Sequence, residues 1–250
     1  MIPIMFDPVD VARATERIVC AGEKKSYYRF RSARFYGGIS TADCVGCCLR
    51  CVFCWSWREL ERPQKYGSLY GPEEVARQLV SIAEHKGYRQ IRISGNEPTI
   101  GKEHLIRVLE LIPREYVFIL ETNGILIGHD ETYAAELARF PNLHVRVSLK
   151  GACEEDFSRL TGARPEGFGL QLSALENLLG HGVRAHPACM VSFSSEESIR
   201  ELRERLRAIG IGDFEVEELI LYPAVQARLK RLGVQFGVSH EPSCVPPDQV

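Results

Sequence analysis

The sequence lacks the features that mark a membrane protein, a secreted protein or a strongly charged binding protein. No run of about eighteen apolar residues occurs, so no segment is predicted to span a membrane. The first residues have neither the basic flank nor the apolar run of a secretory signal, which predicts a cytoplasmic, reducing location. The 31 basic and 33 acidic side chains nearly cancel, so charge gives no indication of a nucleic-acid partner.

Cysteine is unevenly distributed along the 250 residues. Five of the nine cysteines fall close together, at Cys44, Cys47, Cys48, Cys51 and Cys54. An odd total in a chain without a secretory signal argues against a disulfide framework. We therefore interpret this group as thiolates that converge on a metal. The other four lie singly, at Cys20, Cys153, Cys189 and Cys244, and are expected to be buried as small hydrophobic residues.

The spacing of the grouped cysteines limits the kind of metal site. C-x3-C-x2-C occurs in two overlapping registers, one beginning at Cys47 and one at Cys44. A zinc ribbon is not indicated, because its two cysteine pairs are usually about 12–20 residues apart and these are adjacent. A bacterial ferredoxin run fails at its fourth ligand position, which is Arg58. Three thiolates would leave one iron of a four-iron cluster open to bind a substrate directly.

The register Cys47-x3-Cys51-x2-Cys54 has an aromatic residue, Phe53, just before the last cysteine. It resembles the signature of the radical S-adenosylmethionine (SAM) superfamily. Phe53 favours this register because the alternative places Arg50 at the aromatic position. The resemblance implies a [4Fe-4S] cluster on these three cysteines, SAM bound at the open iron, and reductive cleavage of SAM to a 5′-deoxyadenosyl radical that abstracts a substrate hydrogen. An electron donor of the flavodoxin or ferredoxin type is then an expected partner.

Apolar strand-like segments alternate with amphipathic helical segments from about residue 33 onward. Strands are predicted at 33–40, 90–94, 116–121, 144–149, 185–192 and 214–222, and helices at 71–85, 101–111, 130–138, 154–160, 167–179 and 196–209. This alternation implies right-handed βαβ units and a parallel sheet. About six units predict an α/β fold of the partial (β/α)6 barrel type, short of the closed eight-stranded barrel. The family resemblance implies the same fold.

The chain is expected to have three parts: an N-terminal prelude at 1–32, the barrel at 33–238 and a loose tail at 239–250. The prelude contains a predicted helix at 7–20 and a basic, aromatic stretch at 24–31. One interpretation of that stretch is a surface for phosphates or stacked bases. General residue preferences favour the other interpretation, a solvated face with its aromatic rings turned inward.

Polar segments follow several predicted strands, where parallel α/β barrels carry their chemistry. The first candidate is Ser94-Gly95-Asn96-Glu97-Pro98. It resembles the family's Gly-Gly-Glu-Pro segment, which holds the methionine amino group of SAM, with Asn96 in place of the second glycine. Glu97 offers an anion to an ammonium group. In isolation, the segment also fits an ordinary strand-to-helix turn.

Residues 120–124 and 147–151 resemble one branch of the family more closely, the activating enzymes of glycyl-radical proteins. That branch has Asp-Thr-Asn-Gly and Asp-Leu-Lys at these places. The resemblance implies that Glu121, Thr122, Ser148 and Lys150 line the SAM site, although Glu121 and Ser148 replace aspartates. For Glu121 and Lys150, a solvated salt bridge at the rim is the alternative.

The sequence therefore predicts a radical SAM enzyme whose catalytic residues and substrate remain unidentified. We favour a substrate protein, as in the glycyl-radical activases, with a small-molecule or RNA-modifying enzyme as the alternative. From a different class, an iron–sulfur electron-transfer protein with a fourth ligand from one of the scattered cysteines also fits the spacing. Neither a membrane nor a nucleic acid is indicated as a partner.

Overall fold

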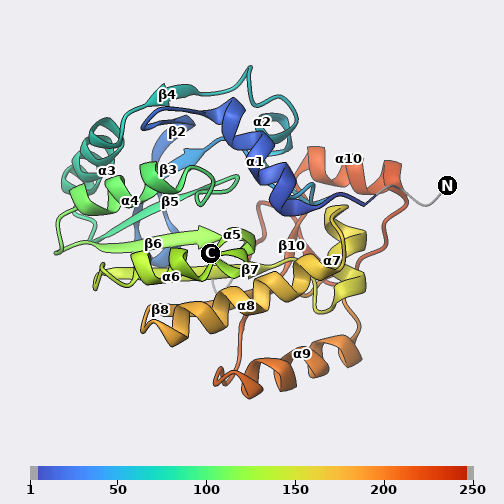
Figure 1. The fold of residues 1–250 in the computed structure, drawn as a ribbon. Helices are drawn as coiled ribbons and strands as arrows, with labels where there is room; N and C mark the ends of the chain where they lie inside the picture. Colours follow the sequence, from blue (N-terminus) through green and yellow to red (C-terminus); the bar gives the residue numbers. More distant parts are fainter. Residues whose placement is uncertain (1–4, 247–250) are drawn as a thin grey trace.

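The computed structural model describes residues 5–246, and a mainly parallel sheet forms its centre (Figure 1). Six parallel strands lie side by side in chain order: β3 (Ile39–Cys44), β5 (Gln90–Gly95), β6 (Val117–Thr122), β7 (Leu143–Leu149), β8 (Arg184–Met190) and β9 (Glu215–Glu217). The predicted α/β fold of the partial (β/α)6 barrel type is confirmed.

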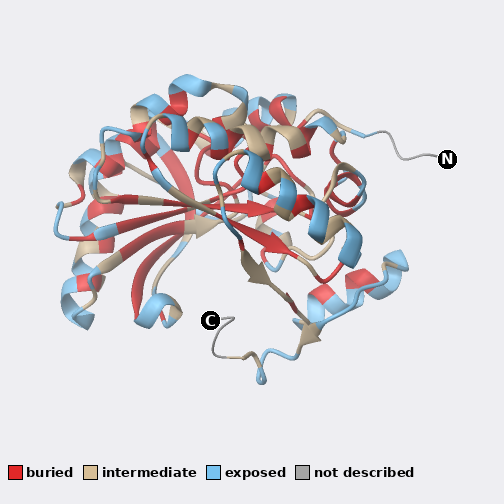
Figure 2. Ribbon diagram, turned by 90° about the horizontal axis from the view of Figure 1, so that it is seen from below, coloured by how far each residue is buried: buried red, intermediate tan, exposed pale blue. Residues whose placement is uncertain are grey.

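Helices follow the strands and cover the outer face of the sheet (Figures 1 and 2). They are α3 (Pro72–Lys86), α4 (Lys102–Leu111), α5 (Ile125–His129), α6 (Glu131–Leu137), α7 (Glu154–Thr161), α8 (Glu166–Gly180) and α9 (Glu196–Ala208). Glycine ends α3 at Gly87, where φ is +69°, as expected for a left-handed helix cap. The six helices predicted from periodicity are confirmed to within about two residues, the scatter expected between boundary definitions.

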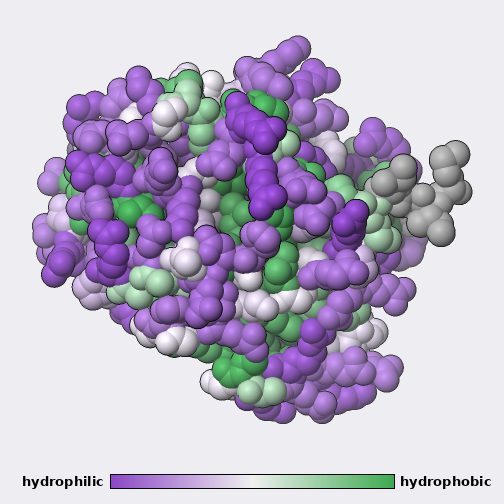
Figure 3. Space-filling model, viewed as in Figure 1, coloured by the Kyte–Doolittle hydropathy of each residue, from purple (hydrophilic) through white to green (hydrophobic). Residues whose placement is uncertain are grey.

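Alternate strand residues point outward and form the core with the helices, because successive strand side chains face opposite sides of a sheet. Ile91, Ile93, Phe118, Leu120 and Val145 are fully buried in this layer. The strands therefore appear as buried ribbons flanked by helices with exposed outer faces (Figure 2). Hydrophilic side chains predominate on the outer surface in the view of Figure 3.

The N-terminal region extends the same sheet. After α1 (Pro8–Val19), the short β1 (Cys20–Ala21) pairs with β2 (Lys24–Ala33), and β2 pairs antiparallel with both β3 and β4 (Ser68–Tyr70). Residues on both sides of the predicted boundary at 33 thus belong to one sheet. Residues 1–4 of the predicted prelude lie outside the described residues.

The strand predicted at 33–40 is wrong. The stretch at 24–31, predicted to be a solvated face with its aromatic rings turned inward, has a buried Tyr27 and an exposed Arg29, but Lys25 and Ser26 are also buried. The chain is extended in β2, turns through a 3-10 helix (Phe35–Gly37), and is extended again from Ile39. Positive φ angles of 54° at Tyr36, 79° at Gly37 and 124° at Gly38 make this turn. The two glycines permit the left-handed backbone that the turn requires.

The C-terminal region is also more structured than predicted. The strand expected at 214–222 is divided into β9 and β10 (Leu219–Ile220), and an additional helix, α10 (Pro223–Leu232), follows. The predicted tail begins with β11 (Ser239–His240), which pairs with β10, and residues 247–250 lie outside the described residues. No helix within residues 5–246 is long and apolar enough to cross a membrane.

Candidate functional site

A loop of residues 45–56, here called the cysteine loop, follows the carboxyl end of β3. Its backbone is held by two distant helices. The N–H groups of Arg50 and Val52 donate to the carbonyl oxygens of Thr161 and Leu160 at 3.0 and 2.9 Å, at the end of α7. On α10, Arg228 donates from Nε to the Val52 carbonyl at 2.6 Å. These contacts fix the loop at the mouth of the barrel.

The five cysteines of this region differ in burial. Cys47 and Cys54 are partly exposed and Cys51 is 8% exposed, whereas Cys44 and Cys48 are fully buried. Cys44 ends β3 and packs into the core between sheet and helices. The register that begins at Cys47 therefore contains both partly exposed thiols, and the register that begins at Cys44 contains neither.

The thiols of the region also differ in their tendency to ionise. Burial raises the pKa of Cys44 to about 12. Burial also raises the pKa of Cys51 and of Cys54, and Lys150 opposes the shift at Cys51. The pKa of Cys47 is lowered, mainly by a hydrogen bond from the Cys48 thiol. Cys47 is thus the thiol of the loop whose ionised form the protein favours.

The candidate ligands of the cysteine loop, Cys47, Cys51 and Cys54, are all free thiols. Thiolates are the ligands of iron–sulfur clusters, in which each cysteine binds a different iron, so the sulfurs need not meet at one point.

The segment after β5 closes tightly on the cysteine loop. Gly95 has φ +101°, and a Cβ there would lie 2.7 Å from the backbone nitrogen of Cys44, so a side chain is excluded. The Asn96 side chain accepts a hydrogen bond from the Gly46 N–H at 2.9 Å and donates one to Ser56 Oγ at 2.7 Å. Asn96, which stands where the related motif has glycine, therefore joins the two ends of the cysteine loop.

Glu97 is buried in the protein and is only 1% exposed. Oε1 accepts hydrogen bonds from the Thr99 N–H at 3.1 Å, the Thr99 hydroxyl at 2.7 Å and the Thr122 hydroxyl at 2.6 Å. Oε2 accepts one from the Asn123 N–H at 2.8 Å. Glu97 and Thr122 are thus brought together, and their contacts join the segments after β5 and β6.

A buried lysine also holds the segment after β5 in place. Lys25, on β2, is fully buried, and its Nζ donates to the carbonyl oxygens of Glu97 at 2.8 Å, Pro98 at 2.9 Å and Ile100 at 2.5 Å. Sequence reasoning missed this residue, because lysine is almost never fully buried and an isolated lysine carries no sign of its partners.

Charged side chains line the inner face of the partial barrel and include several predicted site residues. Ser94 donates to Glu121 at 2.6 Å, and Arg92 forms an ion pair with the other oxygen of Glu121 at 2.8 Å. Arg146, on β7, pairs with both Glu215 and Glu217 at 2.7 and 2.8 Å. Ser94 and Glu121 are therefore brought together as predicted site residues.

Ser148 and Lys150 form a second pair on this face. Ser148 donates to Glu217 at 3.0 Å and accepts a hydrogen bond from Lys150 Nζ. Burial acts to raise the pKa of Glu217, but Arg146 and Lys150 outweigh it, so the pKa is lowered. Lys150 therefore belongs to a network of charged side chains at the mouth of the barrel. Its positive charge also acts to lower the pKa of Cys51.

Two residues of the site were missed from the sequence. The Asn123 side chain donates to the sulfurs of Cys48 and Cys47 at 3.3 and 3.6 Å. Gln171, fully buried on α8, donates to the carbonyls of Asn123 and Ser148 at 2.6 and 3.0 Å. Asn123 lies within the segment 120–124, whereas Gln171 is part of an amphipathic helix in which no sequence pattern distinguishes it.

Phe53, in the cysteine loop, packs against the main core and against a second apolar cluster. Its ring stacks on Phe193 with 5.3 Å between ring centroids, within a small apolar cluster formed by the C-terminal elements. Phe53 therefore anchors the cysteine loop to the last part of the fold.

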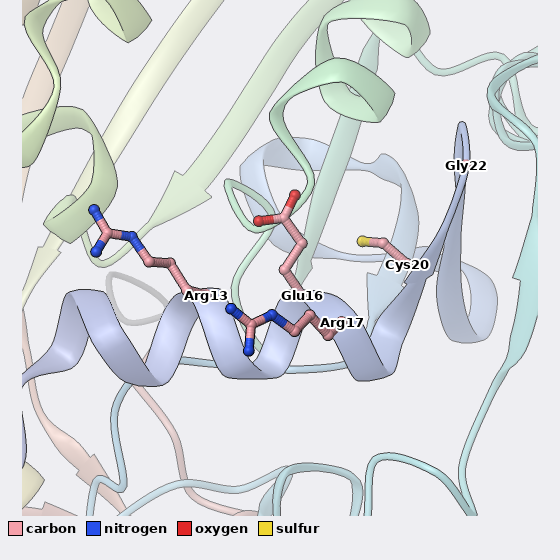
Figure 4. A pocket seen from close by; sticks show the side chains of 5 residues that line it. All are labelled: Arg13, Glu16, Arg17, Cys20 and Gly22. Carbon is pink, nitrogen blue, oxygen red and sulfur yellow. The ribbon is translucent and has the colours of Figure 1, made fainter.

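The surface hollow beside α1 is distinct from this site. It has a volume of about 370 Å³ and is lined by Arg13, Glu16, Arg17, Cys20 and Gly22 (Figure 4). None of these residues belongs to the cysteine loop or to the carboxyl ends of the parallel strands.

Comparison with known proteins identifies one family. The family model described as the radical SAM superfamily matches residues 43–206. A probable GTP 3′,8-cyclase of Methanococcus vannielii is 33% identical over 122 residues, which cover 48% of this chain and 38% of that protein. The GTP 3′,8-cyclase of Pelotomaculum thermopropionicum is 31% identical over 169 residues, covering 66% and 49%. The chain spans less than half the length of both relatives.

Solved structures share the fold at low sequence identity. The structure of Streptococcus suis SuiB bound to S-adenosylmethionine has a TM-score of 0.59 and 21% identity and covers 76% of this chain and 44% of that one. The structure of TYW1 with a lysine-pyruvate adduct has a TM-score of 0.55 and 16% identity, with 74% and 66% covered.

Proposed function

Because this chain belongs to the radical SAM superfamily, we propose that it is an enzyme that uses a [4Fe-4S] cluster and SAM. Cys47, Cys51 and Cys54 are the proposed ligands of the cluster. When bound, the cluster supplies the electron for reductive cleavage of SAM, which provides the hydrogen-abstracting chemistry. Membership of this family favours an enzyme over the iron–sulfur electron-transfer protein that the cysteine spacing also allowed.

The burial of the thiols supports this assignment of ligands. Cys47 and Cys54 are partly exposed, whereas Cys44 and Cys48 are fully buried. Asn123 donates toward the sulfur of Cys47, and such hydrogen bonds orient and tune metal ligands.

For SAM, we propose a binding site formed by the ends of β5, β6 and β7. The backbone from Ser94 to Asn96 and the side chains of Glu121, Ser148 and Lys150 supply its polar groups, because they lie at the carboxyl ends of parallel strands. Glu97 and Thr122 act mainly by holding the two strand-end segments together, since the Glu97 carboxylate already accepts four hydrogen bonds from the protein.

The substrate that we propose is a small, polar molecule. The single observation that carries this proposal is the charged inner face of the barrel, where Arg92, Glu121 and Arg146 occupy positions that closed barrels fill with apolar side chains. Support comes from the relatives, which are named as cyclases of a nucleotide, GTP.

A protein substrate, as in the glycyl-radical activases, is the second candidate. Its support is the resemblance of residues 120–124 and 147–151 to those enzymes, and both segments lie at the carboxyl ends of parallel strands, β6 and β7. Either reaction also requires an electron donor, for which we propose a flavodoxin or ferredoxin type.

The test begins with anaerobic reconstitution of the cluster, followed by reduction in the presence of SAM. The enzyme should form 5′-deoxyadenosine, and absence of this product from fully loaded enzyme would refute the proposed function. Deuterium transfer from labelled nucleotides into 5′-deoxyadenosine would support a small-molecule substrate. Transfer from a deuterated glycine-containing protein, without transfer from nucleotides, would support the activase type instead.

A further inference from the structure

Beside the cysteine loop, β2 carries basic and aromatic side chains that the proposed SAM site does not use. From the arrangement of Tyr28, Arg29, Arg31 and Trp55, we propose that this group binds a phosphate group of a small-molecule substrate. The inference rests on the proposed function, because it assigns a substrate class to the same barrel mouth.

Two arginines share one buried carboxylate in this group. Arg29 and Arg31 lie two residues apart on β2 and donate from Nε to the same oxygen of Asp43 at 2.7 and 2.8 Å. Asp43 neutralises only one of the two positive charges. Within residues 5–246, neither arginine forms a salt bridge to any other acidic group. Together, these three side chains therefore carry one net positive charge.

The arginines also keep N–H donors that Asp43 does not use. A guanidinium has five such donors, and planar pairs of them match the oxygens of a phosphate. The side chains of Arg29 and Arg31 are 44% and 26% exposed, respectively, while Asp43 is fully buried. The carboxylate thus holds the arginines from inside and leaves their outer donors available.

Tyr28 adds an unsatisfied hydroxyl to the same place. Tyr27 pairs with Cys44 and Arg29 pairs with Asp43, so Tyr28 is the extra residue of a β-bulge. Its hydroxyl is shielded from solvent and has no hydrogen-bond partner among the described residues. Buried polar groups are nearly always paired, and an unpaired one calls for a missing partner. A phosphate oxygen provides an acceptor for this hydroxyl.

Aromatic rings keep Arg29 in place next to the cysteine loop. Its guanidinium lies 5.5 Å from the ring centroid of Tyr28 and 5.6 Å from that of Trp55. Trp55 directly follows the candidate ligand Cys54 and is 47% exposed. An arginine held by two rings loses little further freedom when it binds an anion. The bulge of β2 and the end of the cysteine loop thus build one subsite.

The experiment measures binding of inorganic tripolyphosphate to the reconstituted enzyme by anaerobic calorimetry. Arg29→Gln and Arg31→Gln should each weaken binding about tenfold or more, as expected for loss of a charge-assisted hydrogen bond. Tyr28→Phe should weaken it by a smaller factor. The matched control is Arg34→Gln, which removes an exposed arginine close in the chain and should leave the affinity unchanged.

Several results would overturn the inference. Equal affinities for Arg29→Gln and Arg34→Gln, with both variants folded by circular dichroism, would show that the anion binds nonspecifically. Tighter binding of a short single-stranded RNA than of tripolyphosphate would indicate a nucleic-acid backbone as the ligand. Formation of 5′-deoxyadenosine by the wild type, measured separately, distinguishes this inference from the proposed function. Failure to form it concerns the proposed function alone, whereas an enzyme that cleaves SAM but shows no specific loss of tripolyphosphate binding in Arg29→Gln contradicts this inference alone.

Discussion

Asn96 donates a hydrogen bond from its side-chain amide to the hydroxyl of Ser56 at 2.7 Å, which closes the cysteine loop. The Ser56 hydroxyl lies 3.5 Å from the sulfur of Cys54, so the amide acts on a candidate cluster ligand through one intermediate group. The same amide accepts a hydrogen bond from Gly46 at the other end of the loop. A glycine, as in the related family motif, has no side chain with which to make these contacts.

Replacement of Asn96 by glycine should therefore loosen the loop. We expect Asn96→Gly to lower the free energy of unfolding by about 1–2 kcal/mol, as for the loss of a buried hydrogen-bonded group. In the cluster-free protein, Cys54 should react faster with an alkylating reagent, as measured by peptide mass spectrometry. Ser56→Ala should reproduce the faster reaction of Cys54. Unchanged reactivity of Cys54 in both variants would show that the amide does not restrain the loop.

Single cysteine substitutions should distinguish the two registers. We expect Cys47→Ala, Cys51→Ala and Cys54→Ala each to prevent stable cluster assembly, because each removes a thiolate ligand. Cys44→Ala and Cys48→Ala should retain the cluster, since these thiols are fully buried. Iron and sulfide content with visible absorption after anaerobic reconstitution provides the measurement. Retention of the cluster in Cys47→Ala together with its loss in Cys44→Ala would assign the other register.

Loss of the buried Lys25 amine should destabilise the segment after β5. Lys25→Met leaves the carbonyls of Glu97, Pro98 and Ile100 without their donor. We expect the free energy of unfolding to fall by about 3 kcal/mol or more, because buried acceptors would remain unpaired. Chemical denaturation provides the measurement, and Lys24→Met is the control, because the neighbouring Lys24 is exposed. Equal stability of the two variants would contradict this role.

His104 should make the stability of the fold depend on pH. Burial lowers the pKa of His104 from 6.5 to about 4, against an opposing hydrogen bond to the Glu23 backbone. As the pH falls, the unfolded chain binds a proton at His104 at a higher pH than the folded chain does. The contribution of His104 to the free energy of unfolding is therefore complete above pH 6.5 and decreases as the pH falls toward 4. We expect a loss of about 3 kcal/mol over this range.

The measurement is urea denaturation at several pH values between about 4 and 7. His104→Gln should flatten the decrease, whereas His85→Gln, at an exposed position of α3, should leave it unchanged. A wild-type curve that is already flat in this range would contradict the lowered pKa.

The fold and the central motif were predictable because their signals are local. Strand and helix periods extend over a few neighbouring residues, and the spacing of Cys47, Cys51 and Cys54 lies within one loop. β2 was not predictable in this way, since Lys25, Arg29 and Arg31 give it the composition of a solvated segment. Their partners are Asp43 and the carbonyls after β5, which local patterns do not reveal.

The sequence by itself determined the family signature, the alternation of strands and helices, and the strand ends at which polar residues gather. Only the tertiary structure decided which cysteines are partly exposed and that Glu97 is buried. The physical reason is that hydrogen bonding and burial depend on residues far apart in the chain. Lys25 and Glu97 are separated by 72 positions, yet one donates directly to the other. Folding brings such partners together, and their contacts determine which side chains remain available for chemistry.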